Sequence, residues 1–225
     1  MLTATGTTLP ASRHRLLATV AWQLGGQRHY ALEGSVFVAG SLIKWLRDDL
    51  GLLASAAESE PIARSVADNG GVFLVPALSG LGAPWWRPDA RAAISGLSFS
   101  AKRAHVIRAA LEAQAHQTHD LKTAFAGDGC DWTRLRIDGG MAANDWLAQD
   151  LADMLDIEVE RPAFVETTAI GAAMLAGVGA GLFGSLAEAR VLRGETRVFR
   201  PAMGEEQRQA RLDGWTKAVG SVLDN

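Results

Sequence analysis

A tight strand-to-helix corner limits the folds open to this chain more than any other feature. The apolar-leaning stretch 135–137 ends at Asp138, which is followed by Gly139 and Gly140, and a helix-forming run begins at Asn144. Glycine has no Cβ and accepts positive φ, so the two glycines allow a sharp turn and a close approach of backbone to a ligand. Asp138 falls at the carboxyl end of the strand, where α/β sheets bind their ligands.

The corner alone leaves two interpretations open. In the first, Asn144 or a neighbour caps the next helix, whose N-terminal amides attract an anion such as a phosphate. In the second, the three residues 138–140 only turn the chain. The sequence does not contain the Walker pattern G-x-x-x-x-G-K-[ST], and the corner does not have the dinucleotide pattern G-x-G-x-x-G.

Strand and helix patterns alternate through the chain. The expected strands are 16–24, 29–33, 72–75, 135–137 and 158–160, and the expected helices are 38–49, 103–125, 144–155, 169–179 and 204–223. The helix face toward the core is expected to carry Ile43, Leu46 and Leu50 in the first helix, Ile107, Ala110, Leu111, Leu121 and Phe125 in the second, and Trp215 and Val219 in the last. This order predicts an α/β fold with a mixed sheet flanked by helices.

Composition narrows the possible functions. The chain has 225 residues, 48% of them hydrophobic, which suits one large or two small domains with a buried core. Lys and Arg (22) are fewer than Asp and Glu (25) and form no basic run, so we expect no nucleic-acid partner. The most apolar stretch, 169–183, is shorter than the ~20 residues that cross a bilayer, so we expect no membrane span.

The single cysteine bears on location. Cys130 excludes an internal disulfide and is typical of a reducing cytosol, and Met1-Leu2 leads into polar sequence without a signal-peptide pattern. We therefore expect a cytoplasmic protein. Cys130 has no His in its local sequence, so it is not a candidate nucleophile.

Two further groups have a functional and a structural interpretation. His116, His119 and Asp120 have a spacing found at metal sites, but no Cys or third acid lies nearby, so an exposed helix face is preferred and no metal site is predicted. Trp85 and Trp86 are candidates for a platform under a polyol. A buried loop anchor or a subunit contact is the preferred interpretation of this pair.

Several longer stretches resemble one known family. The stretch 93–112, AISGLSFSAKRAHVIRAALE, resembles the signature of the FGGY family of carbohydrate kinases. The stretch 79–97, SGLGAPWWRPDARAAISGL, resembles the loop that marks the branch of this family acting on glycerol. Residues 30–53 are similar to the hairpin strand and following helix of that branch.

The corner itself belongs to the resemblance. The stretch 137–162, IDGGMAANDWLAQDLADMLDIEVERP, is similar to the family's adenosine-side segment, and 166–183 resembles the helix behind it. Together the matching stretches cover roughly residues 16–215 in the family's order.

The resemblance implies a fold and a domain organisation. The family has an actin-like, RNase-H-like ATPase fold in two domains, with ATP and the polyol in the cleft between them. Residues 1–225 resemble only the C-terminal, nucleotide-side domain, and Met1-Leu2-Thr3 is expected to be the truncated edge of a strand. The substrate domain, with its phosphate loop and general base, is expected to be absent. We therefore expect no catalytic residue in this chain and no activity from the chain alone.

The implied activity is ATP-dependent phosphorylation of glycerol to glycerol 3-phosphate, with ATP and Mg²⁺ as cofactors and this chain as the nucleotide-binding half. ATP or ADP would bind this chain, glycerol would bind the other domain, and assembly into a homo-oligomer is left open. Another FGGY polyol or ketose kinase, such as a xylulokinase, is one alternative. A non-catalytic nucleotide-binding or interaction module is the other.

Carried over position by position, the resemblance implies six nucleotide contacts: Gly40, Lys44, Asp138, Gly139, Gly140 and Asn144. Gly40 and Gly140 would let the backbone approach the nucleotide, and Asn144 would hydrogen-bond the adenine. Lys44 shares a helix face with Gly40. Two positions depart from the family, because relatives carry Gln or Arg in place of Lys44 and usually Asp in place of Arg87.

Overall fold

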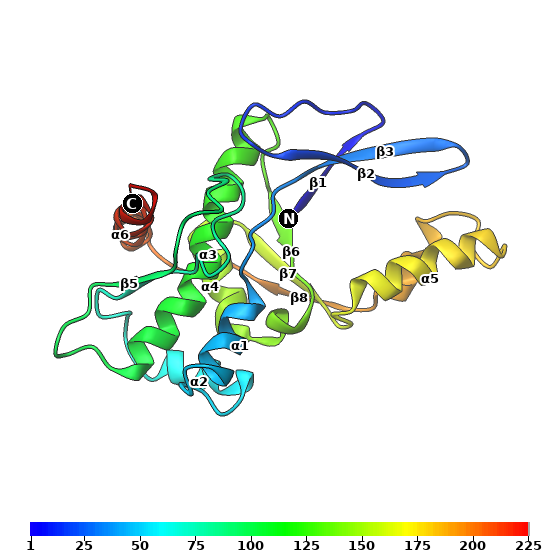
Figure 1. The fold of residues 1–225 in the computed structure, drawn as a ribbon. Coiled ribbons are helices and arrows are strands. Elements are labelled where there is room, and N and C mark those ends of the chain that lie inside the picture. Colours follow the sequence, from blue (N-terminus) through cyan, green and yellow to red (C-terminus); the bar gives the residue numbers. More distant parts are fainter. Residues whose placement is uncertain (225) are drawn as a thin grey trace. The chain divides into compact units, whose positions relative to one another are not determined.

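The computed structural model describes residues 1–224, which form two compact units, one of residues 1–132 and 203–224 and one of residues 133–202 (Figure 1). The first unit contains β1 (Leu2–Gly6), β2 (Leu17–Leu24), β3 (Gln27–Glu33), α1 (Gly40–Asp48), η1 (Ala56–Glu58), α2 (Ser59–Arg64), β4 (Phe73–Val75), β5 (Ala93–Ser95), α3 (Arg103–Gly127) and α6 (Glu205–Leu223). The second contains β6 (Arg134–Arg136), η2 (Gly140–Ala143), α4 (Asp145–Leu155), β7 (Glu158–Pro162), α5 (Thr167–Gly179), η3 (Glu188–Arg193) and β8 (Thr196–Phe199). The predicted α/β class is confirmed.

The first unit is built around α3. Strands β1, β3 and β2 form an antiparallel sheet in that order, and β4 pairs with β5 in a second, two-stranded sheet. The apolar face predicted for the long helix is confirmed, because Ile107, Leu111 and Phe125 are each 0% exposed. The predicted inward residues of α6 are also confirmed. Trp215 and Val219 are each 2% exposed and pack in one cluster with Val75 of β4.

The expectation of an exposed His116 is wrong. Its side chain is 1% exposed and lies between the rings of Phe73 and Trp215, with centroids at 6.0 and 5.2 Å. Burial lowers the pKa of His116 well below its usual value, with a smaller contribution from Arg211. Helix α6 comes from the far end of the sequence and covers this face of α3, which the local pattern around His116 does not indicate.

Asp120 lies one helical turn beyond His116 and meets the same tryptophan. The indole Nε1 of Trp215 donates a hydrogen bond to Asp120 Oδ2 at 2.9 Å. Burial raises the pKa of Asp120 to about 6, although hydrogen bonds from Trp215 and Trp85 act in the opposite direction. The folded pKa is thus above the ordinary value of 3.8, so folding takes up a proton between these values and the stabilising contribution of Asp120 falls as pH rises through them.

The variant Asp120→Asn should reveal this pH dependence. Asparagine keeps an acceptor for Trp215 but does not titrate. The free energy of unfolding of the variant minus that of wild type should therefore be more positive at pH 7.5 than at pH 4.5, by on the order of 2 kcal/mol. Urea unfolding of both proteins at the two pH values measures this difference. The effect of His116 titration on stability is present in both proteins, so it largely cancels in the difference. A difference independent of pH would show that Asp120 ionises normally.

The second unit is a β-α-β unit with one added strand. β6 and β7 are parallel, with Leu135 opposite Val159, and β8 pairs antiparallel to β7, so the predicted mixed sheet is confirmed. Helix α4 crosses between β6 and β7 and contacts both β7 and β8. Leu147 (4%), Val159 (0%) and Phe199 (6%) are buried in this unit.

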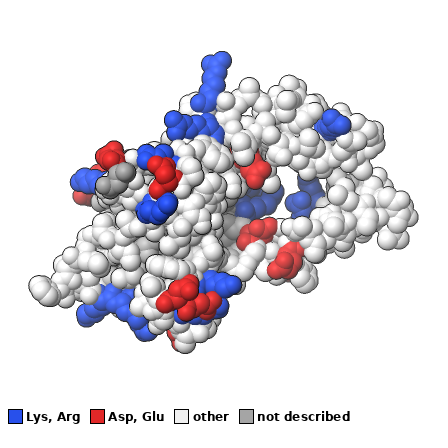
Figure 2. Space-filling view, viewed as in Figure 1, with Lys and Arg blue, Asp and Glu red and all other residues white. Residues whose placement is uncertain are grey.

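The surface carries charges of both signs. On the face drawn in Figure 2, Lys and Arg side chains and Asp and Glu side chains occur in small separate or mixed groups, and most of the surface is uncharged. Within residues 1–224, no helix is long and apolar enough to cross a membrane.

Candidate functional site

The corner after β6 has a backbone geometry that requires glycine at one position. Gly139 has φ 76° and ψ 179°, a region that residues with a Cβ essentially do not occupy. Its amide donates to the carbonyl of Val165 at 2.9 Å, which joins the corner to the loop after β7. Both glycines were expected to be able to adopt a positive φ, but only Gly139 adopts one. Gly140 instead begins the short 3-10 helix η2.

Both glycines leave the space above them open. A Cβ built on Gly139 or on Gly140 would meet no heavy atom within 4 Å, and Gly140 is exposed. The backbone at Gly140 is therefore accessible to a ligand from outside. This accessibility is the geometric property that the sequence interpretation of the corner required.

Asn144 is the N-cap of α4, as predicted. Its Oδ1 accepts a hydrogen bond from the amide of Leu147 at 2.9 Å, and its backbone carbonyl accepts from Ala148 at 3.1 Å. The chain thus passes from η2 into α4 with one side chain satisfying a backbone donor that has no partner within the helix.

Asp138 makes contacts that the other corner residues do not make. The hydroxyl of Thr167, the first residue of α5, donates to its carboxylate. Asp138 lines a cavity of about 510 Å³ in the second unit, whereas Gly139, Gly140 and Asn144 do not. The cavity is also lined by Arg136, Glu160, Phe164, Met174, Arg190 and Arg193.

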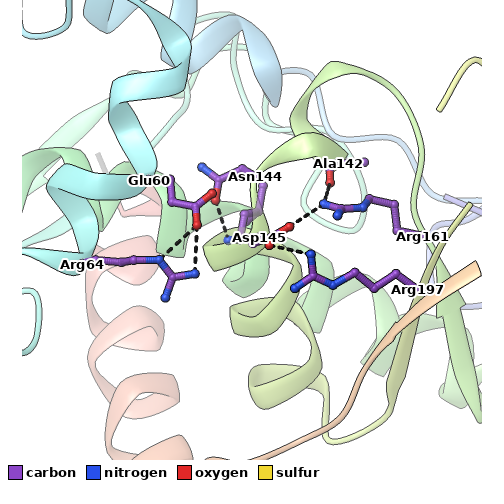
Figure 3. A network of polar contacts seen from close by, with 8 residues as sticks. Glu60, Arg64, Ala142, Asn144, Asp145, Arg161 and Arg197 are labelled. Carbon is purple, nitrogen blue, oxygen red and sulfur yellow. Dashed lines mark hydrogen bonds and ion pairs between the residues drawn. The ribbon is translucent and has the colours of Figure 1, made fainter. Parts of the chain in front are cut away.

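An ion-pair network that the sequence interpretation missed lies beside the corner (Figure 3). Asp145, the first residue of α4, pairs with Arg161 of β7 at 2.8 Å and with Arg197 of β8 at 2.6 Å. Partial burial acts to raise the pKa of Asp145, but the hydrogen bonds from the two arginines outweigh it and lower the pKa. Arg161 also donates to the carbonyl of Ala142 in η2 at 2.7 Å. An acid directly after a helix cap was the only local signal of this network.

The other two predicted contacts lie in the first unit. Gly40 is the first residue of α1, and Lys44, four residues on, is exposed. The helix buries Leu42, Ile43 and Leu46. Leu50 was expected on the same face, but it is 44% exposed because α1 ends at Asp48. The six predicted residues therefore form two groups, one in each unit.

Trp85 and Trp86 anchor their loop, which is one of the two interpretations preferred from the sequence. Trp86 Nε1 donates to the carbonyl of Arg15 at 2.7 Å, and Trp85 packs against the cluster around Trp215. Arg87, a departure from the family pattern, pairs with Asp89 at 3.0 Å and donates to the carbonyl of Leu223 at 2.6 Å. This arginine fastens the loop to the end of α6.

Metal-ligating side chains are dispersed through the described part of the chain. Among residues 1–224, no three His, Cys, Asp or Glu side chains are grouped so that they could hold a metal ion. His116 and Asp120 are engaged with Trp215 instead.

The sequence of the chain matches a known protein family and several characterised relatives. Residues 1–180 match the model of the FGGY family of carbohydrate kinases, C-terminal domain. The chain is 51% identical to a glycerol kinase of Coxiella burnetii over 223 residues and 53% identical to one of Rhodospirillum centenum over 216 residues. These alignments cover 99% and 96% of this chain but 44% and 43% of the relatives, so the chain spans less than half of their length.

Solved structures of carbohydrate kinases have the same fold as this chain. The crystal structure of Plasmodium falciparum glycerol kinase with ADP superposes with a TM-score of 0.88 at 34% identity, over 99% of this chain and 45% of that one. A xylulose kinase from Lactobacillus acidophilus has a TM-score of 0.79 at 19% identity over 97% and 44% of the two chains, which shows a shared fold. The expected actin-like, RNase-H-like fold class is confirmed. The chain belongs to the FGGY family of carbohydrate kinases.

Proposed function

We propose that this chain is the nucleotide-binding domain of an ATP-dependent glycerol kinase, which converts glycerol and ATP to glycerol 3-phosphate and ADP. The observation that carries the proposal is the open corner, where Gly139 takes a glycine-only conformation and leaves the backbone of Gly140 accessible. Identities of 51% and 53% to proteins named glycerol kinase support the choice of substrate. A cytoplasmic location is part of the proposal.

In this proposal the corner binds the adenosine part of the nucleotide. Gly140 contacts it through the backbone, and Asn144 hydrogen-bonds the adenine. Asp138 and Gly139 complete the turn that presents them. Gly40 and Lys44 of α1 contribute a second set of contacts.

The chemistry assigned to this domain is positioning. Phosphoryl transfer requires the γ-phosphoryl group to be held in line with the attacking hydroxyl, with its charge neutralised. This chain would fix the nucleoside, while glycerol and the general base belong to the substrate domain, which lies outside residues 1–225. Mg²⁺ would neutralise phosphate charge when bound.

The 225-residue chain should bind ADP but form no glycerol 3-phosphate by itself. General-base catalysis is typically worth about 10²–10⁴-fold, and the proposal assigns the base to the other domain. Calorimetric titration with ADP tests the first part, and a coupled assay with ATP and glycerol tests the second. Absence of ADP binding by the folded chain would contradict the nucleotide assignment. Sustained product formation would contradict the assignment of the base.

Asn144 offers a separate test of the adenine contact. Asn144→Ala should lower the free energy of unfolding by about 0.5–2 kcal/mol through loss of the cap. It should also weaken ADP binding several-fold, as a lost neutral hydrogen bond predicts. Asn144→Ser keeps a capping oxygen and loses the amide, so its stability should remain near wild type while ADP binding weakens. Thermal melting and ADP titration separate the two effects. Wild-type ADP affinity in the serine variant would restrict Asn144 to capping.

A further inference from the structure

The 3-10 helix η2 is a single short turn. It has four residues, and the amides of Ala142 and Asn144 bond to the carbonyls of Gly139 and Met141, both at 3.1 Å. Short 3-10 segments have poorer hydrogen-bond geometry than α-helices. The turn that contains Gly140 and leads to Asn144 therefore needs support from outside itself to keep one conformation.

Arg161 supplies a contact on each side of Asn144. Its guanidinium donates to the carbonyl of Ala142 at 2.7 Å and pairs with the carboxylate of Asp145 at 2.8 Å. The side chain is 16% exposed and its guanidinium carbon lies 5.3 Å from the ring centre of Phe199, which is buried. Both contacts are made by Nη1, one terminal nitrogen of the rigid planar guanidinium, so Arg161 can hold η2 and the first residue of α4 at a fixed separation.

We propose that Arg161 is a positioning residue for nucleotide binding, which acts by holding the turn from Gly140 to Asn144 in its binding conformation. The inference rests on the proposed function and adds a residue that the family resemblance did not indicate. A turn ordered before the ligand arrives avoids the entropic cost of ordering it on binding. Loss of these two contacts should therefore weaken nucleotide binding, although Arg161 itself does not contact the nucleotide.

Arg197 provides a matched control within the same network. It pairs with the same carboxylate of Asp145 at 2.6 Å, and its guanidinium carbon lies 4.8 Å from the centre of the same Phe199 ring. It donates a hydrogen bond to Asp145, it makes none to η2 among the described residues, and its side chain is 58% exposed. Arg197 thus shares with Arg161 the ion pair and the aromatic contact, but it does not hold the Ala142 carbonyl.

The test compares Arg161→Gln, Arg161→Lys and Arg197→Gln in the 225-residue chain, with ADP as the probe in calorimetric titration. Arg161→Gln should weaken ADP binding on the order of 3- to 10-fold. Arg197→Gln should change it less than about 2-fold, as expected for an exposed ion pair. Arg161→Lys keeps the charge but not the rigid planar guanidinium, so its affinity should lie between wild type and Arg161→Gln.

Hydrogen exchange separates positioning from general destabilisation. In Arg161→Gln, the amides of residues 140–147 should exchange faster than in Arg197→Gln, when both are measured below their melting transitions. If Arg161→Gln does not fold, Arg161→Lys carries the comparison. Equal ADP affinities in the Arg161 and Arg197 variants overturn this inference alone, because wild type still binds. If the folded wild-type chain binds no ADP, the proposed function and this inference both fail.

Discussion

Gly139→Val should lower the free energy of unfolding by about 1–3 kcal/mol, whereas Gly140→Val should change it far less. Gly139 has φ 76° and ψ 179°, and a valine there is strained by its own backbone, since the space above it is open. Gly140 has no positive φ and the same open space, so a side chain is accommodated there. Urea unfolding of the two variants measures the contrast.

The same pair separates folding from binding. By the proposed function, the valine at position 140 occupies space that the nucleotide needs, so Gly140→Val should lose most ADP affinity while it melts near wild type. Gly140→Ala, with a smaller side chain, should lose less. Wild-type ADP affinity in Gly140→Val would show that the corner only turns the chain. Equal destabilisation by the two valines would contradict the assigned backbone geometry.

Trp215→Ala should cost about 3–5 kcal/mol, the usual range for removing a large buried aromatic side chain. Trp215 is 2% exposed, stacks on His116 with ring centres 5.2 Å apart, and donates to Asp120. The alanine leaves a cavity beside α3 and removes the indole donor from the half-buried carboxyl of Asp120.

Trp215→Phe is the control for the Trp215→Ala experiment. It keeps an aromatic ring against His116 and loses the indole donor, so it should cost clearly less than alanine. Chemical unfolding at pH 7.5 gives both values. A cost below about 1 kcal/mol for Trp215→Ala would show that α6 contributes little to the core.

Local patterns were sufficient to predict the main elements. The 3.6-residue spacing of Ile107, Leu111 and Phe125 predicted α3, and the strand, corner and cap predicted β6 and α4 around Asn144. Strands β5 and β8 and helix α2 were missed, whereas a strand at Met1-Leu2-Thr3 was expected from the resemblance and β1 begins at Leu2. The two missed strands have three and four residues, too few for a periodicity to be recognised, and their pairing depends on partners distant in sequence.

The candidate site was predictable only in part, for the same physical reason. The two glycines and Asn144 are adjacent in sequence, so their chemistry could be interpreted locally. Arg161 and Arg197 meet Asp145 across gaps of 16 and 52 residues, and no local pattern indicates that meeting. His116 was misassigned because the ring that buries it belongs to α6, about 100 residues further on.

The discontinuity of the first unit has a consequence for synthesis on the ribosome. This unit consists of residues 1–132 and 203–224, so Asp120 meets its partner Trp215 only after the chain has grown 95 positions further. Residues 133–202 emerge as one contiguous segment and can fold before that contact forms. Until α6 arrives, the face of α3 around His116 lacks the cover that Trp215 provides. A nascent chain stalled before residue 203 should therefore expose this apolar surface to chaperones, whereas one stalled well beyond residue 225 should not.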